Sequence, residues 1–332
     1  MAGAHLVDSF GRVARALRLS VTDRCNLRCR YCMPAEGLPW IPRGELLSDD
    51  EIVALAAAFG RLGVRDVRVT GGEPLVRPGL PDLVRRLVEL PYLGEVSLTT
   101  NGVLLAGQVD DLVAAGLRRV NVSVDSLDPE RFAAITRRRD LDRVLEGLEA
   151  CERHPGLRPI KVNVVALRGV TESELLDFAQ LARRKPYVVR FIEVMPLDAP
   201  REWRRDLVLP GSEIRAAIAA RWPLVALAPD RPSSTATRWA FADGAGEIQL
   251  VSSVTEPFCD SCDRLRLTAD GQLRTCLFAE SETDLRTPLR EGASAERLDE
   301  IIRHAVRAKP AGHRMADPGW TYSGRPMSMI GG

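Results

Sequence analysis

Three closely spaced cysteines near the N-terminus are suited to bind a metal centre. Cys25, Cys29 and Cys32 form a C-x3-C-x2-C run. Cysteine thiolates hold iron–sulfur clusters, and a cubane of four irons normally takes four of them. A structural zinc site instead needs four protein ligands that fill its tetrahedral coordination. A disulfide framework is typical of much shorter secreted chains. Three thiolates without a nearby fourth therefore predict a cluster with one iron open to another ligand.

A second group of three cysteines lies far along the chain. Cys259, Cys262 and Cys276 form a C-x2-C-x13-C arrangement, again without a fourth cysteine in reach. Cys151 falls in a predicted helix and is interpreted as a small core residue. A lone C-x2-C is also typical of half a zinc site. A second set of three ligands favours a second cluster with its own open iron.

Two further stretches carry polar groups that suit a ligand. The turn Thr70–Pro74, reading TGGEP, follows a predicted strand, and its glycines let backbone groups approach a ligand closely. On its own this motif is equally typical of a strand-ending turn. Arg264 and Arg266 alternate between the second cysteines, so both side chains can face one ligand, and guanidinium groups suit phosphate. Without the flanking cysteines, two surface arginines would be the simpler interpretation.

Residues 17–194 repeat a strand–turn–helix unit six times, which positions these groups. Capping boxes at Ser48 with Glu51 and at Thr171 with Glu174 mark predicted helix starts. Alternation of this kind predicts parallel strands joined by right-handed crossovers. The predicted strands span 17–21, 66–70, 95–99, 119–124, 161–166 and 187–194.

The first five of these strands are apolar on one face and polar on the other. Val120, Val122 and Val124 alternate with Asn121 and Ser123, for example. Helices must cover the apolar face, while an ordinary eight-stranded barrel fills its interior with apolar side chains. The pattern predicts a wide or incomplete barrel around a polar ligand. An open sheet with one half-wet face is the alternative, although parallel sheets are usually covered on both sides.

Three cations fall on the polar strand face, namely Arg18, Arg68 and Lys161. Lys161 is unusual because the chain has only two other lysines, Lys185 and Lys309, among 46 basic residues. A buried cation needs a partner of opposite charge. Inside a barrel we expect that partner to be an anionic substrate. The alternative is that Lys161 forms a structural ion pair with Asp125 or Glu193.

The plan changes after residue 196. The sequence predicts a helix over 212–221, short antiparallel segments around 235–241, 247–252, 264–268 and 272–276, a helix over 294–307, and an irregular tail. We therefore expect a partial barrel over 1–211 and a second region over 212–332 that is α+β and contains a small antiparallel sheet.

Net charge, apolar runs and cysteine content indicate which partners and which compartment to expect. The net charge of +1 gives no general attraction to nucleic acid or to an acidic membrane, and no apolar run reaches membrane-spanning length. The first cysteine motif begins so early that we expect no signal peptide. Six clustered cysteines indicate metal ligands in a reducing compartment, so the expected location is the cytoplasm.

The chain resembles the GTP 3′,8-cyclase (MoaA) family of molybdenum cofactor biosynthesis, within the radical S-adenosylmethionine (SAM) superfamily. The resemblance covers nearly the whole chain and rests on these segments: RLSVTDRCNLRCRYCMP, VTGGEPLVR, LTTNG, NVSVDSLD, KVNVV, RFIEVMP, CDSCDRLRLTADGQLRTCLF and the final MIGG. It implies an α/β fold with an incomplete (β/α)6 TIM-type barrel. It also implies two [4Fe-4S] clusters, of which the N-terminal one cleaves SAM and the C-terminal one binds GTP. The implied product is 3′,8-cyclo-7,8-dihydro-GTP, the first intermediate of molybdopterin biosynthesis.

The resemblance implies a role for each matching residue. The SAM cluster would be held by Cys25, Cys29 and Cys32, and the second cluster by Cys259, Cys262 and Cys276. The SAM contacts would be Tyr31, Gly72, Ser123 and Met195. The nucleotide contacts would be Arg18, Arg68, Thr99, Lys161, Arg264 and Arg266. The catalytic residues would be Arg18, Gly331 and Gly332.

One position departs from the family pattern, because Asp263 stands where we expect asparagine. A carboxylate beside a cluster and a triphosphate would weaken substrate binding slightly. The resemblance also implies three protein partners: a reductase or small electron donor, the next pathway enzyme (cyclic pyranopterin monophosphate synthase), and a second copy in a homodimer. Two alternatives stay open, namely a peptide-modifying radical SAM enzyme with an auxiliary cluster and a non-catalytic zinc-binding module.

Overall fold

Six parallel strands form the centre of the fold. The computed structural model describes residues 5–198, 201–315, 317, 320, 322 and 324–331. Neighbouring strands pair in chain order and in parallel. Their bounds are β3 (Ala16–Ser20), β4 (Asp66–Thr70), β5 (Glu95–Thr100), β6 (Arg119–Ser123), β7 (Ile160–Ala166) and β8 (Tyr187–Glu193). The predicted strand ranges are thus confirmed to within a few residues.

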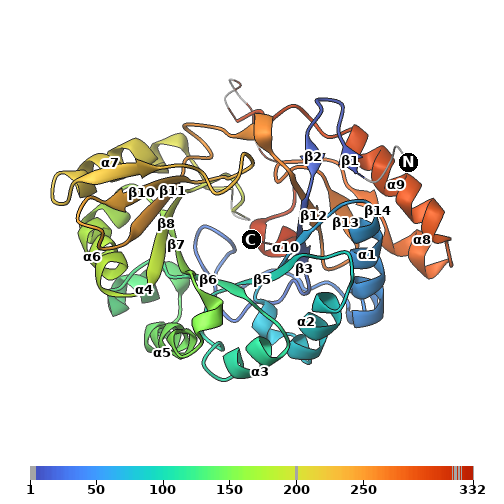
Figure 1. The fold of residues 1–332 in the computed structure, drawn as a ribbon, viewed down its shortest axis with the longest axis horizontal. Helices are drawn as coiled ribbons and strands as arrows, with labels where there is room; N and C mark the ends of the chain where they lie inside the picture. The colour runs from blue at the N-terminus through green and yellow to red at the C-terminus, as the bar shows by residue number, and fades with distance from the viewer. Residues whose placement is uncertain are drawn as a thin grey trace.

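Helices between the strands cover the outer face of this sheet (Figure 1). The inward faces of the helices and the apolar strand face form one large core. The helices are α1 (Asp49–Arg61), α2 (Leu80–Val88), α3 (Val109–Ala114), α4 (Pro129–Thr136), α5 (Leu141–Glu152) and α6 (Leu175–Arg184).

The two predicted capping boxes have different outcomes. Ser48 Oγ accepts from the Glu51 amide at 3.2 Å while the Glu51 carboxylate accepts from the Ser48 amide at 2.8 Å, so the first box is confirmed. The second is wrong, because Thr171–Glu174 forms a 3-10 turn and α6 begins at Leu175. The Glu174 carboxylate instead accepts from Ser126 and Leu127 in the loop after β6.

The strands after residue 211 extend both edges of the parallel sheet. β11 (Glu247–Val251) pairs in parallel with β8, and β12 (Arg264–Leu267) pairs in parallel with β3. The predicted antiparallel pairing begins at the outer side of these two strands. At one edge β11 pairs with β10 (Thr237–Phe241) and β10 with β9 (Leu224–Leu227), and at the other β12 pairs with β13 (Gln272–Arg274) and β13 with β14 (Thr283–Asp284). The antiparallel strands therefore form two flanks of one 12-stranded sheet.

This sheet curves into an incomplete barrel whose end strands, β14 and β9, do not pair with each other. Figure 1 shows the strands around a centre that holds α10 (Met327–Ile330). The expected incomplete barrel is thus confirmed and the alternative of a flat open sheet is not.

The remaining elements lie around the second region. The predicted helices over 212–221 and 294–307 are confirmed as α7 (Gly211–Ala219) and α9 (Ala295–Arg307), and α8 (Arg286–Arg290) precedes α9. A separate two-stranded hairpin joins β1 (Leu6–Val7) and β2 (Val13–Ala14). None of the helices in the described ranges combines the length and apolar character needed to cross a membrane.

Candidate functional site

The loop after β3 brings its three cysteines to a central cavity of about 330 Å³. Cys25, Cys29 and Cys32 are free thiols and all line this cavity. Cys25 Sγ accepts from the Leu27 amide at 3.4 Å and from Asn101 Nδ2 at 3.8 Å. Burial raises the pKa of Cys25 to about 12 and that of Cys32 to about 11. Thiols in this position lose their protons only when a strong positive centre such as a metal binds them.

The glycine-rich turn after β4 packs directly against the cysteine loop. The Gly72 amide donates to the carbonyl of Thr22 at 2.8 Å, and a Cβ on Gly72 would overlap the carbonyl oxygens of Asp23 and Arg24. Glu73 then accepts from Thr100 Oγ1 at 2.6 Å and from the Asn101 amide at 2.7 Å. TGGEP is thus a strand-ending turn whose first four residues line the cavity, and its contact with a ligand stays a prediction.

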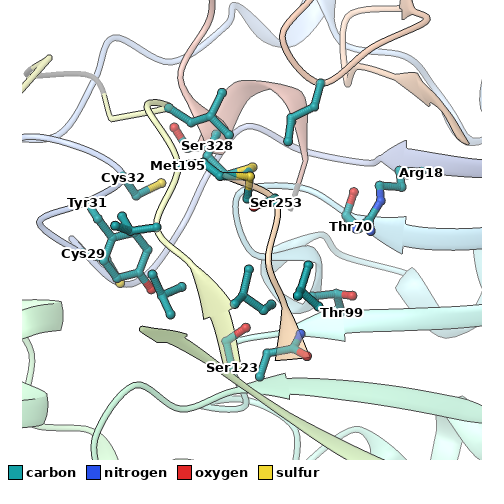
Figure 2. A pocket seen from close by; sticks show the side chains of 18 of the residues that line it. Arg18, Cys29, Tyr31, Cys32, Thr70, Thr99, Ser123, Met195, Ser253 and Ser328 are labelled. Carbon is teal, nitrogen blue, oxygen red and sulfur yellow. The ribbon is translucent and has the colours of Figure 1, made fainter. Parts of the chain in front are cut away.

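Tyr31 links the cysteine loop to the end of β6. Its hydroxyl donates to Asp125 Oδ2, and the Val165 amide donates to Asp125 Oδ1 at 2.8 Å. Burial raises the pKa of Asp125 to about 6. Both carboxylate oxygens of Asp125 thus accept a hydrogen bond from within the protein. Tyr31, Ser123 and Met195 all line the same cavity. Figure 2 shows Cys29, Cys32 and Tyr31 on one side of it, with Arg18, Thr70 and Thr99 opposite.

Three arginines lie side by side on adjacent strands across from the cysteine loop. Arg266 on β12 pairs in register with Arg18 on β3, and Arg18 with Arg68 on β4. Burial, reinforced by the neighbouring arginines, lowers the pKa of Arg18 and Arg68 well below the usual range and that of Arg266 to about 9. Arg68 Nε is buried without a hydrogen-bond partner in the described residues. A row of adjacent guanidinium groups, of which Arg266 is buried and Arg18 and Arg68 are half-buried, is suited to bind an anion.

Lys161 lies in a second cavity of about 260 Å³ rather than in the cysteine-lined one. Arg18, Arg68 and Arg264 line both cavities, so the two share one wall. Burial, then the nearby Arg190 and Arg119, lowers the pKa of Lys161 to about 7. The proposed structural pairs are wrong: Asp125 binds Tyr31, and Glu193 accepts from Val254 and Thr255.

Residues 228–236, between β9 and β10, cross the strand ends beside this second cavity. Arg231 pairs with Asp66 at the start of β4, and Ser233 Oγ donates to Asp263 Oδ2 at 2.7 Å. Asp263 is buried, and its carboxylate is not among the groups lining either cavity. Ser233, which holds this carboxylate, lines the second cavity, and the slight weakening of substrate binding by Asp263 stays a prediction.

The second cysteine group lines the same central cavity as the first. Cys259, Cys262 and Cys276 are free thiols that line it together with Arg264 and Arg266. Arg12, paired with Asp8 at 2.6 Å, donates to the carbonyl of Cys259 at 2.8 Å. The positive charges of Arg264 and Lys309 outweigh burial and lower the pKa of Cys262, whereas burial raises that of Cys276.

The segment after α10 enters the barrel between these walls. Ile330 and Gly331 are buried, and the Arg266 guanidinium donates to the carbonyl of Gly331. A Cβ on Gly331 would overlap Thr70 Oγ1 on β4. The structure thus places Gly331, which the resemblance gives a catalytic role, inside the barrel, while Gly332 lies outside the described residues.

Two family models match the chain. Residues 19–182 match the Radical SAM superfamily model, and residues 187–315 match the Molybdenum Cofactor Synthesis C model. The chain is 49% identical over 333 residues to GTP 3′,8-cyclase of Streptomyces coelicolor, covering 99% of this chain and 97% of that one. It is 48% identical to GTP 3′,8-cyclase of Mycobacterium sp. strain KMS, covering 98% and 93%.

The chain belongs to the GTP 3′,8-cyclase family. Its fold is similar to that of Streptococcus suis SuiB bound to S-adenosylmethionine, with a TM-score of 0.61, 12% identity and coverage of 90% of this chain and 69% of that one. Histidine-tagged anSMEcpe with bound AdoMet is similar at a TM-score of 0.50 and 16% identity, over 63% and 58% of the two chains. At these identities both neighbours indicate the fold alone.

The described residues fit the cofactors of the GTP 3′,8-cyclase family, which are SAM and two [4Fe-4S] clusters. Six free thiols line the central cavity. Buried polar atoms without a partner in the described residues also line it, and a ligand would satisfy them: Arg68 Nε, Asn163 Oδ1, Ser253 Oγ, His313 Nδ1 and Ser328 Oγ.

The sequence analysis missed several cavity residues of this family member. Arg190 on β8 lines both cavities and donates to Gln249 Oε1 at 2.9 Å. It pairs in register with Asn163, so strand alternation applied to 187–194 would have placed it on the polar face. Ser253 and His313 lie in irregular segments, and no sequence signal marks them.

Proposed function

We propose that this protein is a radical SAM GTP 3′,8-cyclase that forms 3′,8-cyclo-7,8-dihydro-GTP. The observation that carries the proposal is that one cavity is lined by both cysteine groups and by the three adjacent arginines Arg18, Arg68 and Arg266. Membership of the GTP 3′,8-cyclase family supports the same reaction. A peptide substrate gives no reason for adjacent Arg18, Arg68 and Arg266 on the barrel wall.

We assign the first cluster to Cys25, Cys29 and Cys32, and SAM contacts to Tyr31, Gly72, Ser123 and Met195. When bound and reduced by one electron, this cluster and SAM supply a 5′-deoxyadenosyl radical, which abstracts hydrogen from C3′ of the GTP ribose so that C3′ can attack C8 of guanine. The chain orients the reacting groups and excludes water, which the buried position of the cavity residues supports.

We assign the second cluster to Cys259, Cys262 and Cys276, with its open iron toward the purine. The triphosphate contacts in this proposal are Arg18, Arg68, Lys161, Arg264 and Arg266, and Thr99 faces the nucleotide from β5. The shared wall of the two cavities supports this division, because a nucleotide between the cysteine groups can extend its phosphates past Arg18 toward Lys161.

Gly331 and Gly332 complete the site in this proposal. Contact of Gly331 with Arg266, which is in register with Arg18, supports a positioning role of the tail on the arginine row. We also propose a cytoplasmic location, a reductase or small electron donor, transfer of the product to cyclic pyranopterin monophosphate synthase, and a homodimeric state. These four points rest on the family.

The test is anaerobic incubation of the reconstituted protein with SAM, a reductant and GTP, followed by mass spectrometry and NMR of the nucleotide. We expect 5′-deoxyadenosine, methionine and a cyclised isomer of GTP, because the hydrogen lost from C3′ is balanced by one electron and one proton after cyclisation. Replacing GTP by ATP is the control, because only guanine contacts distinguish them. Formation of 5′-deoxyadenosine without a cyclised nucleotide would contradict the proposal.

A further inference from the structure

The side chain of Lys309 is buried against the second cysteine group. Lys309 follows α9 and is 4% exposed. Its Nζ donates to Cys262 Sγ at 3.5 Å, to the carbonyl of Cys262 at 2.9 Å and to the carbonyl of Arg264 at 3.0 Å. These contacts use all three donors of an ammonium group.

This lysine has no carboxylate partner in the described part of the chain. Lys185, in contrast, pairs with Glu152 at 3.0 Å on a side chain that is 40% exposed. A buried cation without a carboxylate is costly unless another negative group lies beside it. The negative group in reach of Lys309 is the sulfur of Cys262, once that sulfur is a thiolate.

In the part of the chain that the structure describes, the first cysteine group has no equivalent hydrogen bond from a cation to a sulfur, because Arg28 donates to the carbonyl of Cys25 at 2.7 Å. The hydrogen bonds that the described residues donate to Cys25 Sγ come from the Leu27 amide and the Asn101 side-chain amide, which are neutral donors. Among the described residues, only the second group therefore receives a hydrogen bond from a buried charge. Hydrogen bonds to cluster sulfurs and charges near the cluster are the main means by which a protein adjusts its reduction potential.

We propose that Lys309 raises the reduction potential of the second cluster through its hydrogen bond and charge at Cys262 Sγ. Reduction adds one electron, taken from the external donor, to the cluster, while Lys309 keeps its proton and no bond breaks. A positive charge at hydrogen-bond distance stabilises the more negative, reduced state. Lys309 is thus a positioning residue that acts through Cys262, and this inference rests on the proposed assignment of the second cluster.

The test is a dithionite redox titration of the full-length holoenzyme, followed by electron paramagnetic resonance. The cluster signal that added SAM does not change is assigned to the second cluster. At the potential where the wild-type second cluster is half reduced, we expect Lys309→Met to lower its reduced-to-oxidised ratio about tenfold, which is about 59 mV for a one-electron couple. Lys309→Arg should keep most of the wild-type potential. Lys185→Met is the matched control and should leave both signals unchanged.

An unchanged potential in Lys309→Met with full iron would overturn the inference. If that variant loses iron, the comparison of Lys309→Gln with Lys309→Arg decides, because the inference requires the higher potential in the charged variant. Loss of second-cluster iron in all three variants would also overturn it and leave Lys309 a purely structural role. Cys262→Ala tests the assignment separately: if it keeps the second signal and full iron, the proposed ligands are wrong whatever Lys309 does.

Discussion

Arg266 donates a hydrogen bond to the carbonyl oxygen of Gly331, which ties the tail to the arginine row on the barrel wall. Arg266 is 7% exposed, so this carbonyl replaces part of the water that a guanidinium would otherwise bind. Gly331 has φ of +79° and no room for a Cβ beside Thr70. Glycine is therefore required here both by the backbone conformation and by the close contact.

Deletion of Gly331 and Gly332 should abolish the cyclised product while leaving iron content and GTP affinity nearly intact. The reason is that Gly331 contacts Arg266 and Thr70 rather than a cysteine. Product formation is measured by mass spectrometry and iron by a colorimetric assay. Gly107→Ala, at a site with no atoms within 4 Å of the added Cβ, is the control. A short peptide with the tail sequence should restore some activity, and a deleted enzyme with wild-type product formation would end the idea.

Replacing Cys25, Cys29 and Cys32 together with alanine should halve the bound iron and stop SAM cleavage. Replacing Cys259, Cys262 and Cys276 should also halve the iron but spare reductive SAM cleavage, because the first cysteine group is unchanged in that variant. Cys151→Ala is the control, since Cys151 is buried within α5 away from both groups. Full iron content in either triple variant would show that its cysteines hold no cluster.

Lys161→Ala should weaken GTP binding far more than SAM binding. Lys161 lies in the cation-lined second cavity, and loss of one charge-assisted contact costs about 1.5–3 kcal/mol. Isothermal titration calorimetry measures the affinities for GTP and SAM. Arg266→Ala should also weaken GTP binding far more than SAM binding. Lys185→Ala, on the exposed pair with Glu152, is the matched control. Equal GTP affinity in wild type, Lys161→Ala and Arg266→Ala would remove both residues from the binding site.

Nucleotide binding should take up a proton above neutral pH. Without an anion the pKa of Lys161 is about 7, so this lysine is mostly neutral at about pH 8. A bound triphosphate raises that pKa, and the affinity therefore falls as pH rises from about 7 towards the raised value. Calorimetry in two buffers of different ionisation enthalpy measures the uptake. Lys161→Ala should take up fewer protons, and equal uptake in both proteins would contradict the assignment.

Gly72→Ala should disrupt the first cysteine loop. The added Cβ would overlap the carbonyls of Asp23 and Arg24 just before Cys25, and overpacking of this kind costs about 1–3 kcal/mol. We expect a lower melting temperature and loss of SAM binding, measured by thermal unfolding and calorimetry. Gly44→Ala, where nothing lies within 4 Å, should change neither. Normal SAM affinity in Gly72→Ala would show that the loop adjusts.

The central strands were predictable because the sequence alternates at period two. Val120, Asn121 and Val122 show the pattern on β6, and the observed burial places the strand in the core with its polar side at the cavity. The joining of β11 to β8 and of β12 to β3 was not predictable, since pairing between distant strands leaves no local signal. The short antiparallel segments were recognised, but their division between two edges was not.

Part of the site was predictable for the same reason. Cys25, Cys29 and Cys32 are close in sequence, and Arg18 and Arg68 follow from strand alternation. Lys161 obeys the same rule, but it lies near the start of β7 and lines the second cavity. Alternation predicts the face of a strand on which a side chain lies, but not which cavity along the strand it lines. Lys309 was noticed only for its rarity, and its contact with Cys262 comes from a segment that carries no pattern.

The placement of β11 and β12 has a consequence for how the chain avoids aggregation. The six central strands would by themselves expose the backbone groups of β3 and β8, and unpaired strand edges are templates for pairing with other chains. Both edges are covered by strands that follow residue 211. A fragment over residues 1–211 would therefore expose the unpaired backbone groups of both β3 and β8. Selection against aggregation thus ties the two regions together, independently of the shared cavity.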